Sequence, residues 1–449
     1  MKKIIILLNI LFISLIGCKK PTEPPEPPPP PILDEPTLRL ELDDAHCTEV
    51  WIKFTSAKLK TPNTLILKQY NPNDDSLIHT INLITQDTLL HIDSLLPNKT
   101  YRYKAEAIEN NKVYTTNELI VQTMDTTSHN FTFEMFTFGG EIGSSVLFDV
   151  AIINENNIWA VGDIWIKSDT SATGYIKYNA VHWNGTEWKL HRIMFYTICG
   201  QYNRTPYPAK AIFVFNENDI WIAMDGDQIA RMNGTVQVSV ECLPYSFVIN
   251  KIWGTSSNNL YVVGNLGNIL HYNGLRWRRI ESHTTLNIND IWGDYNPKTN
   301  EWELLAVGGN ILAGYENCVI QIHSNNSTKR LNTEGAEWPL RSTWFEAGGN
   351  YYIAGSGIYQ KHILNDNIWK NDIFSITTYS TNRIRGIEIN DISATGGAGE
   401  LLHFNGYSWK SFIDEVGIPG NYYSTDINGN TIISVGQSSN QAVITIGKR

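Results

Sequence analysis

A repeated glycine limits what this chain can fold into more than any other feature of its sequence. Short apolar runs of mixed β-branched and aromatic residues end in glycine at intervals of about 40 residues, as successive hairpin strands do. The glycines that mark the register are Gly162, Gly264, Gly308, Gly355, Gly396 and Gly436. The first interval is double and contains a weaker copy around Trp221, which brings the number of copies to seven.

Asparagine and tryptophan supply a second register for the same repeat. Four tryptophans each follow an asparagine by four residues, and they are Trp188, Trp277, Trp369 and Trp409. Asn-Gly supplies the positive-φ residues of a tight hairpin, and the tryptophan can pack the outer strand onto the neighbouring unit. Four-stranded units of about 40 to 45 residues are typical of a β-propeller. The last unit, from Tyr423, has three strands, so residues 131–138 are expected to supply the fourth and close the ring.

The sequence therefore predicts an all-β chain with a seven-bladed β-propeller over residues 131–449. The pattern resembles the tryptophan-glycine propeller repeats of bacterial surface proteins and, more loosely, the BNR and YVTN propellers. That resemblance implies the fold but no single activity. The Asp-box of BNR sialidases is absent from the turns, which argues against a glycosidase of that type.

The N-terminus has the features of an export signal. Lys2 and Lys3 precede an apolar run at residues 4–16, which is too short to span a bilayer. The following Gly17-Cys18 resembles the lipobox of bacterial lipoproteins, which implies removal of residues 1–17 and lipidation of Cys18. Since Lys19 rather than aspartate follows, we expect an anchor in the outer membrane or at the cell surface. The proline-rich residues 18–36 favour an extended tether.

Residues 37–124 alternate in short strands and predict a β-sandwich. The strands are expected at residues 38–42, 50–54, 65–70, 77–83, 101–108 and 113–121. The segment from Leu95 through Pro97 to Tyr101 resembles the tyrosine corner of fibronectin type III domains, and Trp51 stands where that family has a core tryptophan. The resemblance implies a spacer or packing module.

Charge and cysteine content exclude some functions. A net charge of −10 without a basic run argues against nucleic-acid binding. No Cys-x-x-Cys pair is present, and His182, His271 and His403 repeat with the ring, so we expect no metal and no cofactor. An exported chain could join Cys199 to Cys242, but equivalent points on neighbouring blades usually lie beyond the ~7 Å Cα limit of a disulfide.

Two tryptophans, Trp165 and Trp338, remain after those that fit the repeat, the sandwich or a predicted strand are set aside. Trp165 falls in an expanded loop at residues 163–178, and a long link at residues 195–210 is expected to emerge on the same face. Exposed aromatic side chains on such loops favour binding of sugars or proteins. The candidate contact residues are Trp165, Tyr175, Tyr202, Arg204 and Tyr207, with Trp338 on a distant blade. Alternatively, these rings only pack their own loops.

No sequence cluster identifies a reaction, so the expected function is a monomeric, non-catalytic surface module that binds a protein or glycan partner. The alternative is an enzyme acting on extracellular polysaccharide. Acid–base chemistry on a sugar needs two carboxylates about 5 to 10 Å apart. Paired carboxylates in the central funnel would favour the enzyme, whereas an apolar or featureless funnel would favour the binding module.

Overall fold

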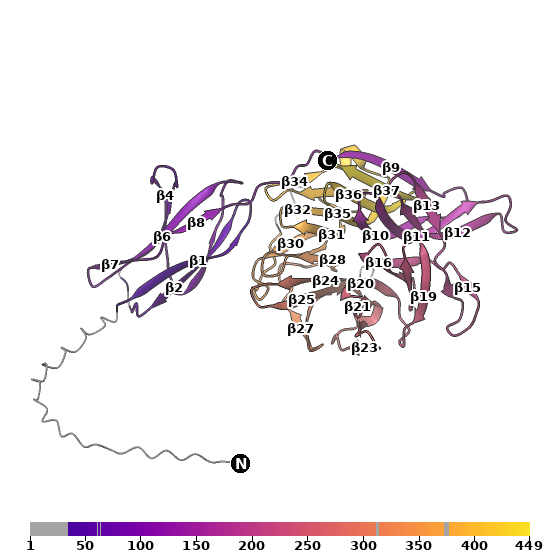
Figure 1. Ribbon diagram of the computed structural model, residues 1–449, viewed down its shortest axis with the longest axis horizontal. Coiled ribbons are helices and arrows are strands. Elements are labelled where there is room, and N and C mark those ends of the chain that lie inside the picture. Colours follow the sequence, from indigo (N-terminus) through magenta and orange to yellow (C-terminus); the bar gives the residue numbers. More distant parts are fainter. Residues whose placement is uncertain (1–34, 61, 63, 311–313, 372–376) are drawn as a thin grey trace, which may run out of the picture.

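The computed structural model describes residues 35–60, 62, 64–310, 314–371 and 377–449 (Figure 1). The predicted lipidation site Cys18 and most of the predicted tether lie outside the described residues. Strands make up nearly all of the regular structure, so the prediction of an all-β chain is confirmed. No helix within the described ranges has the length and apolar character that a membrane span requires.

The first domain is a sandwich of two antiparallel sheets. One sheet contains β1 (Thr37–Ala45), β2 (Val50–Ala57) and β5 (Thr88–Ile92). The other contains β3 (Thr64–Tyr70), β4 (Leu77–Asn82), β6 (Thr100–Glu109), β7 (Lys112–Thr115) and β8 (Leu119–Gln122). Apolar side chains such as Phe54 and Leu67 alternate inward and form one core. The single strand predicted at 113–121 is two strands, and β5 was missed because its apolar run is short.

Seven further sheets of three or four strands follow in chain order within the described residues. The first sheet contains β10 (Val146–Asn154), β11 (Asn157–Lys167), β12 (Tyr175–Trp183) and β13 (Trp188–His191), and the second contains β16 (Ala209–Asn216), β17 (Asp219–Met224), β18 (Gln228–Asn233) and β19 (Val236–Cys242). The third contains β20 (Ile249–Ser256), β21 (Asn259–Gly264), β22 (Ile269–Tyr272) and β23 (Trp277–Ile280), and the fourth contains β24 (Ile288–Asn296), β25 (Glu301–Gly309), β26 (Asn317–Ile322) and β27 (Thr328–Leu331). The fifth sheet contains β28 (Ser342–Phe345), β29 (Tyr351–Gly355) and β30 (Gly357–Lys361). The sixth contains β31 (Thr381–Glu388), β32 (Asp391–Gly396), β33 (Leu401–Phe404) and β34 (Trp409–Ser411), and the seventh contains β35 (Gly420–Asn428), β36 (Thr431–Ser438), β37 (Gln441–Lys448) and β9 (Thr132–Phe138).

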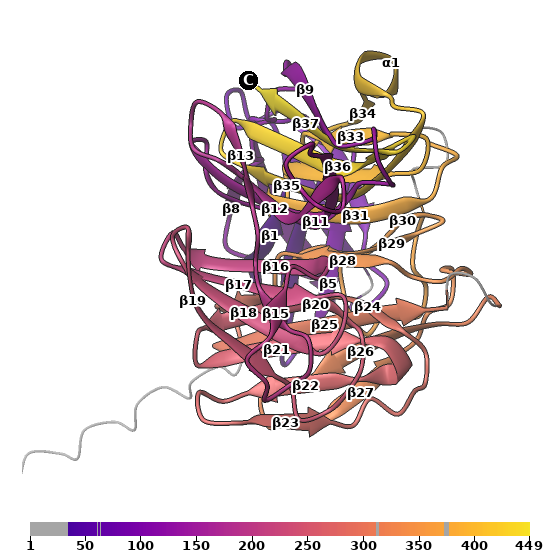
Figure 2. The same cartoon turned by 90° about the vertical axis from the view of Figure 1, so that its right-hand side faces the viewer.

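These sheets are arranged in a ring. The first strand of each sheet packs against the first strand of the next, and β35 packs against β10 (Figures 1 and 2). Strand β9 pairs with β37 over Thr132–Phe138, so the last sheet takes its outer strand from the start of the domain. Figure 1 shows the C-terminus beside β9. The first strands therefore surround a common axis.

Apolar clusters between neighbouring sheets hold the ring together. The four register tryptophans lie in four such clusters, each of which joins adjacent sheets. Trp277, for example, also donates its indole N–H to Glu241 of the preceding sheet at 3.1 Å. The fifth sheet differs from the prediction of four strands, because it has three strands among the described residues. There Trp369 is buried without belonging to a strand, and its backbone N–H donates to Glu334 O at 2.8 Å.

The first domain and the segment that follows it contact the fourth, fifth and sixth sheets of the ring. The Trp51 ring stacks on His362 with a centroid separation of 3.6 Å. The hydroxyl of Thr127 donates to Asn390 O at 2.6 Å, and Lys298 pairs with Asp43 at 3.0 Å. Stacking, hydrogen bonding and an ion pair thus fix the sandwich against one side of the ring.

Candidate functional site: the mouth of the ring axis

A β-bulge recurs near the start of the first strand in six of the sheets. The extra residue has no partner on the second strand, and a bulge of this kind turns its side chain away from the regular alternation. In the fifth sheet, Arg341 directly precedes β28 and occupies the corresponding place. The seven residues are half-buried, each between two buried neighbours: Phe148, Lys210, Asn250, Asn289, Arg341, Asn382 and Tyr423.

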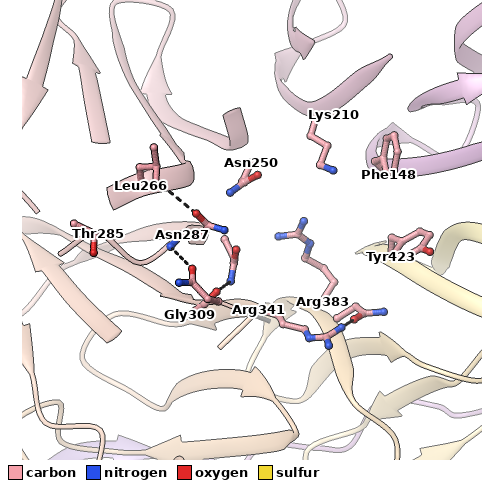
Figure 3. A pocket seen from close by; sticks show the side chains of 13 residues that line it. Phe148, Lys210, Asn250, Leu266, Thr285, Asn287, Gly309, Arg341, Arg383 and Tyr423 are labelled. Carbon is pink, nitrogen blue, oxygen red and sulfur yellow. Dashed lines mark hydrogen bonds between the residues drawn. The ribbon is translucent and has the colours of Figure 1, made fainter. Parts of the chain in front are cut away.

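These seven side chains surround a cavity of about 740 Å³ that opens on the ring axis (Figure 3). We call this cavity the axial mouth. Its remaining lining residues are Leu266, Thr285, Asn287, Gly309, Asn310 and Arg383. Antiparallel pairing places the start of each first strand beside the end of the second, so the mouth opens on the face that also carries the loops between second and third strands. The predicted loop site and the mouth therefore share one face.

Positive charge collects at the axial mouth. Its lining includes Lys210, Arg341 and Arg383, whereas none of the thirteen lining residues is acidic. Arg383 pairs with the buried Asp290 at 2.8 Å. Among the described residues, neither Lys210 nor Arg341 forms an ion pair, and the guanidinium of Arg341 donates to the side-chain oxygen of Asn382. Burial lowers the pKa of Arg341, as expected for a cation without a carboxylate partner.

The asparagines at the mouth tie neighbouring sheets together. The amide of Asn250 donates to Ile288 O at 3.0 Å, and the amide of Asn289 donates to Leu340 O at 2.7 Å. Asn382 repeats this bond to the last sheet. Because their amide N–H groups are used in this way, these residues stabilise the ring and define the rim of the cavity.

Apolar side chains complete the wall of the mouth. The rings of Phe148 and Tyr423 have a centroid separation of 6.2 Å, and Lys210 Nζ lies 4.3 Å from the Phe148 centroid. Leu266 lies in the short 3₁₀ turn η1 (Asn265–Gly267) with φ 57° and ψ 36°, and its side chain is 68% exposed. A left-handed conformation is an outlier for a bulky residue and costs roughly 1 to 2 kcal/mol. The fold thus accepts local strain where it presents this leucine at the mouth.

Below the mouth, the axis is filled by a buried ionic layer. Asp149 pairs with Lys251 at 2.5 Å, and Asp290 accepts two hydrogen bonds from Arg385, at 2.8 and 2.9 Å. Burial alone would raise the pKa of both carboxyls, but the adjacent cations outweigh it and hold each pKa below its ordinary value. Burial lowers the pKa of Lys251 to about 8, against the opposing effect of Asp149.

This ionic layer bears on the enzyme alternative. Asp149 and Asp290 are fully buried and bound to cations, so they are placed as structural anions. Asp426 is different, because burial raises its pKa to about 6. It lines a second cavity of about 240 Å³ that also includes Trp253 and Trp292. Asp149 and Asp290 therefore do not supply the solvent-accessible acid–base pair that sugar hydrolysis needs.

The predicted contacts Trp165 and Tyr175 lie on strands, which corrects the prediction of a loop at 163–178. They extend β11 and β12, and their rings lie 4.7 Å apart. Lys177 Nζ lies 3.8 Å from the Trp165 ring, whose indole N–H donates to Asp163 at 3.0 Å. The aromatic pair therefore packs within its own hairpin. Because the strands extend this far, the loop between them is limited to residues 168–174.

The predicted link at 195–210 contains a small hairpin formed by β14 (Phe195–Tyr196) and β15 (Arg204–Thr205). Arg204 lies over the Tyr196 ring at 4.5 Å, and Tyr207 packs into the cluster between the first and second sheets. Tyr202, at the tip, is fully exposed. Trp338 lies in the link before β28, 42% exposed and edge-to-face with Tyr315. The six predicted residues are thus not brought together at one site.

The structure contains the disulfide Cys199–Cys242, against the expectation from blade geometry. The backbone N–H of Tyr196 donates to Gln228 Oε1 at 2.9 Å, which holds the link along the second sheet. Cys199 consequently lies over the outer strand of that sheet rather than at an equivalent point between blades. The resulting Cα separation of 6.1 Å is within the range of a disulfide.

The three repeated histidines serve local packing. His182 stacks on Trp159 and His271 on Tyr261, each with a centroid separation of 4.4 Å. His403 is buried and lies 2.8 Å from Asp391. Among the residues that the structure describes, no three potential ligands are placed to hold a metal ion.

Sequence reasoning missed the axial mouth. A signal was present at the starts of the third, fourth and sixth units. Each has a triplet in which an asparagine stands between an apolar residue or threonine and a charged residue: Ile249-Asn250-Lys251, Ile288-Asn289-Asp290 and Thr381-Asn382-Arg383. Aligning the seven units on these triplets would have grouped Lys210 and Arg341 with the three asparagines. Nothing local to Leu266 indicates its conformation.

Comparison with known proteins supports the fold. No family model matches the chain, and no curated protein does. Among solved structures, "YCF48 bound to D1 peptide" is similar with a TM-score of 0.51 and 14% identity, over 72% of this chain and 99% of that one. The ring is a β-propeller. The WD40 β-propeller domain of Doa1 also matches, with a TM-score of 0.46 and 12% identity, over 72% and 98% of the two chains. At 14% identity the likeness to YCF48 shows the fold alone.

Proposed function

We propose that this chain is a non-catalytic binding module whose β-propeller receives a segment of a partner protein at the axial mouth. One observation supports this most strongly. Bulge residues from six sheets of the ring, and Arg341 from the fifth, turn toward a single cavity, and two cations in that cavity, Lys210 and Arg341, are not neutralised within the described structure. Concave sites with a few convergent polar groups are the usual places of ligand binding.

The similar structure gives independent support for a protein partner. Its description states that YCF48 was bound to the D1 peptide, so a propeller of comparable form holds a peptide. We extend that class of ligand, a peptide or protein segment, to this chain. A glycan ligand is the alternative, and the experiment below separates the two.

The proposed architecture places this module on a stalk. The ring of seven sheets with the β9–β37 pairing supports a seven-bladed propeller. In the sandwich, Leu96 N donates to the Tyr101 hydroxyl oxygen at 2.9 Å, which supports a fibronectin type III-like tyrosine corner. Lipidation of Cys18 would then anchor a monomer in the bacterial envelope, at the outer membrane or cell surface, with residues 18–36 as tether.

Site-specific photo-crosslinking in the producing cells tests this function. A photoreactive amino acid at Leu266 reports on the mouth, one at Tyr202 reports on the predicted loop site, and one at the exposed Arg279 on β23 serves as the control. We expect a discrete protein adduct from Leu266 and none from Arg279. An adduct from Tyr202 alone would place the site on the link. A carbohydrate adduct at Leu266, or no adduct there, would contradict a protein ligand at the mouth.

A further inference from the structure

We propose that the axial mouth selects a carboxylate flanked by apolar residues, and that its ligand is therefore a short acidic peptide segment. The carboxylate is an Asp or Glu side chain or a free C-terminus. This inference rests on the proposed function, which it deepens by naming the chemistry that the mouth recognises.

The first argument is uncompensated charge. Figure 3 shows the Lys210 and Arg383 side chains directed into the same opening, with Arg341 beside them. Arg383 already has Asp290 as its partner, whereas Lys210 and Arg341 have no carboxylate partner among the described residues. Both are half-buried, so water compensates their charges less well than at the open surface. A bound carboxylate would supply the missing anion.

The ionic layer below the mouth explains why the protein does not supply that anion itself. Asp149 and Asp290 are held by Lys251 and Arg385 and by hydrogen bonds from within the ring. Neither carboxylate can turn toward Lys210 or Arg341 without leaving a buried cation unpaired. The mouth therefore remains a site for an external carboxylate.

The second argument concerns the apolar side chains next to the cations. Leu266 is exposed in a strained conformation, and Phe148 and Tyr423 line the opposite wall. Residues held in strained conformations are found preferentially at ligand sites. An inorganic anion or an acidic sugar has no apolar side chain to pack against an exposed leucine, whereas a peptide can supply one. A cavity of about 740 Å³ admits a short segment and not a folded surface.

Fluorescence anisotropy with the full-length chain in detergent micelles tests the inference. The probes are labelled short peptides that combine Asp or Glu with Leu or Phe, and matched peptides with Asn or Gln. Each is made with a free and with an amidated C-terminus. We expect the acidic peptides to bind roughly tenfold or more tightly than their amide counterparts, with affinity falling as salt increases. The two C-terminal forms distinguish a side-chain carboxylate from a terminal one.

Lys210→Met and Arg341→Met remove the two charges while keeping an unbranched side chain. Each should weaken binding of the acidic peptides about tenfold, and Arg341→Lys should retain most of the affinity because it keeps the charge. Arg279→Met, which removes an exposed cation from β23, is the matched control and should bind as the wild type does. Unchanged thermal unfolding would show that the variants are folded.

Several results would overturn the inference. These are equal affinity for neutral peptides, wild-type affinity in both methionine variants, tighter binding of polygalacturonate than of any acidic peptide, and absence of saturable binding by every acidic peptide. A Leu266 adduct together with equal affinity for neutral peptides would leave the proposed function intact and refute only the selection of a carboxylate. Absence of the Leu266 adduct would refute the proposed function itself.

Discussion

The axial mouth and the β11–β12 hairpin both combine aromatic rings with cations, but the hairpin supplies an anion for Lys177, whereas the mouth supplies none for Lys210 or Arg341 among the described residues. Trp165 has Tyr175, Lys177 and Asp163 as partners within twelve residues of sequence. At the mouth, Lys210 and Arg341 come from different sheets and find no anion within the described structure. Aromatic residues in an unusually long connection therefore indicate binding less well than charges that lack a partner.

The first prediction concerns the ionic layer that supports the mouth. Asp290→Asn should lower the free energy of unfolding by about 3 to 5 kcal/mol, because it leaves Arg385 and Arg383 buried without their anion. Asp163→Asn in the hairpin should cost about 1 kcal/mol or less, since its Lys177 pair is partly solvated. Urea unfolding of both variants measures the difference. Equal losses would show that the two regions do not differ as the contacts indicate.

The second prediction concerns the link that the sequence marked as a binding loop. Replacing Cys199 and Cys242 with serine should lower the free energy of unfolding by about 2 to 4 kcal/mol, since the bridge closes a loop of 43 residues. Thermal unfolding of the variant and of the oxidised wild type measures this effect. Binding of acidic peptides should stay within twofold of the wild type. A large loss of affinity would instead make the link part of the site.

Periodic features could be predicted from the sequence, whereas features created by the ring could not. Asn273 and Trp277 define one unit because hairpins and outer-strand packing depend on neighbours close in sequence. The convergence of Phe148, Lys210 and Arg341 depends instead on bulges and on ring closure, which place distant residues together. The disulfide escaped prediction for the same reason, because the path of the link is set by tertiary contacts.

The third prediction concerns how the free energy of unfolding depends on pH through Asp426. Burial raises the pKa of Asp426 from an ordinary 3.8 to about 6, so its contribution to stability is present below pH 4 and is lost as the pH rises toward 6. The unfolding free energy of the wild type relative to Asp426→Asn should therefore fall by about 1 to 2 kcal/mol across this window. Denaturant unfolding at pH 4, 5 and 6 measures that difference. A pH-independent difference would show that Asp426 titrates normally.

The last prediction tests whether the strained backbone conformation of Leu266 serves ligand binding. Leu266→Gly should raise the free energy of unfolding by about 0.5 to 1 kcal/mol, because glycine adopts the left-handed conformation of this position without steric cost. The same variant should bind acidic, leucine-containing peptides more weakly, since it removes the apolar contact. Leu275→Gly is the matched control: this leucine is 88% exposed in the hairpin between β22 and β23, and its φ is not positive. Glycine should give no stabilisation there and leave peptide binding unchanged. If Leu266→Gly gains stability and keeps full affinity, the leucine is not part of the ligand site, and the apolar half of the proposed recognition is wrong.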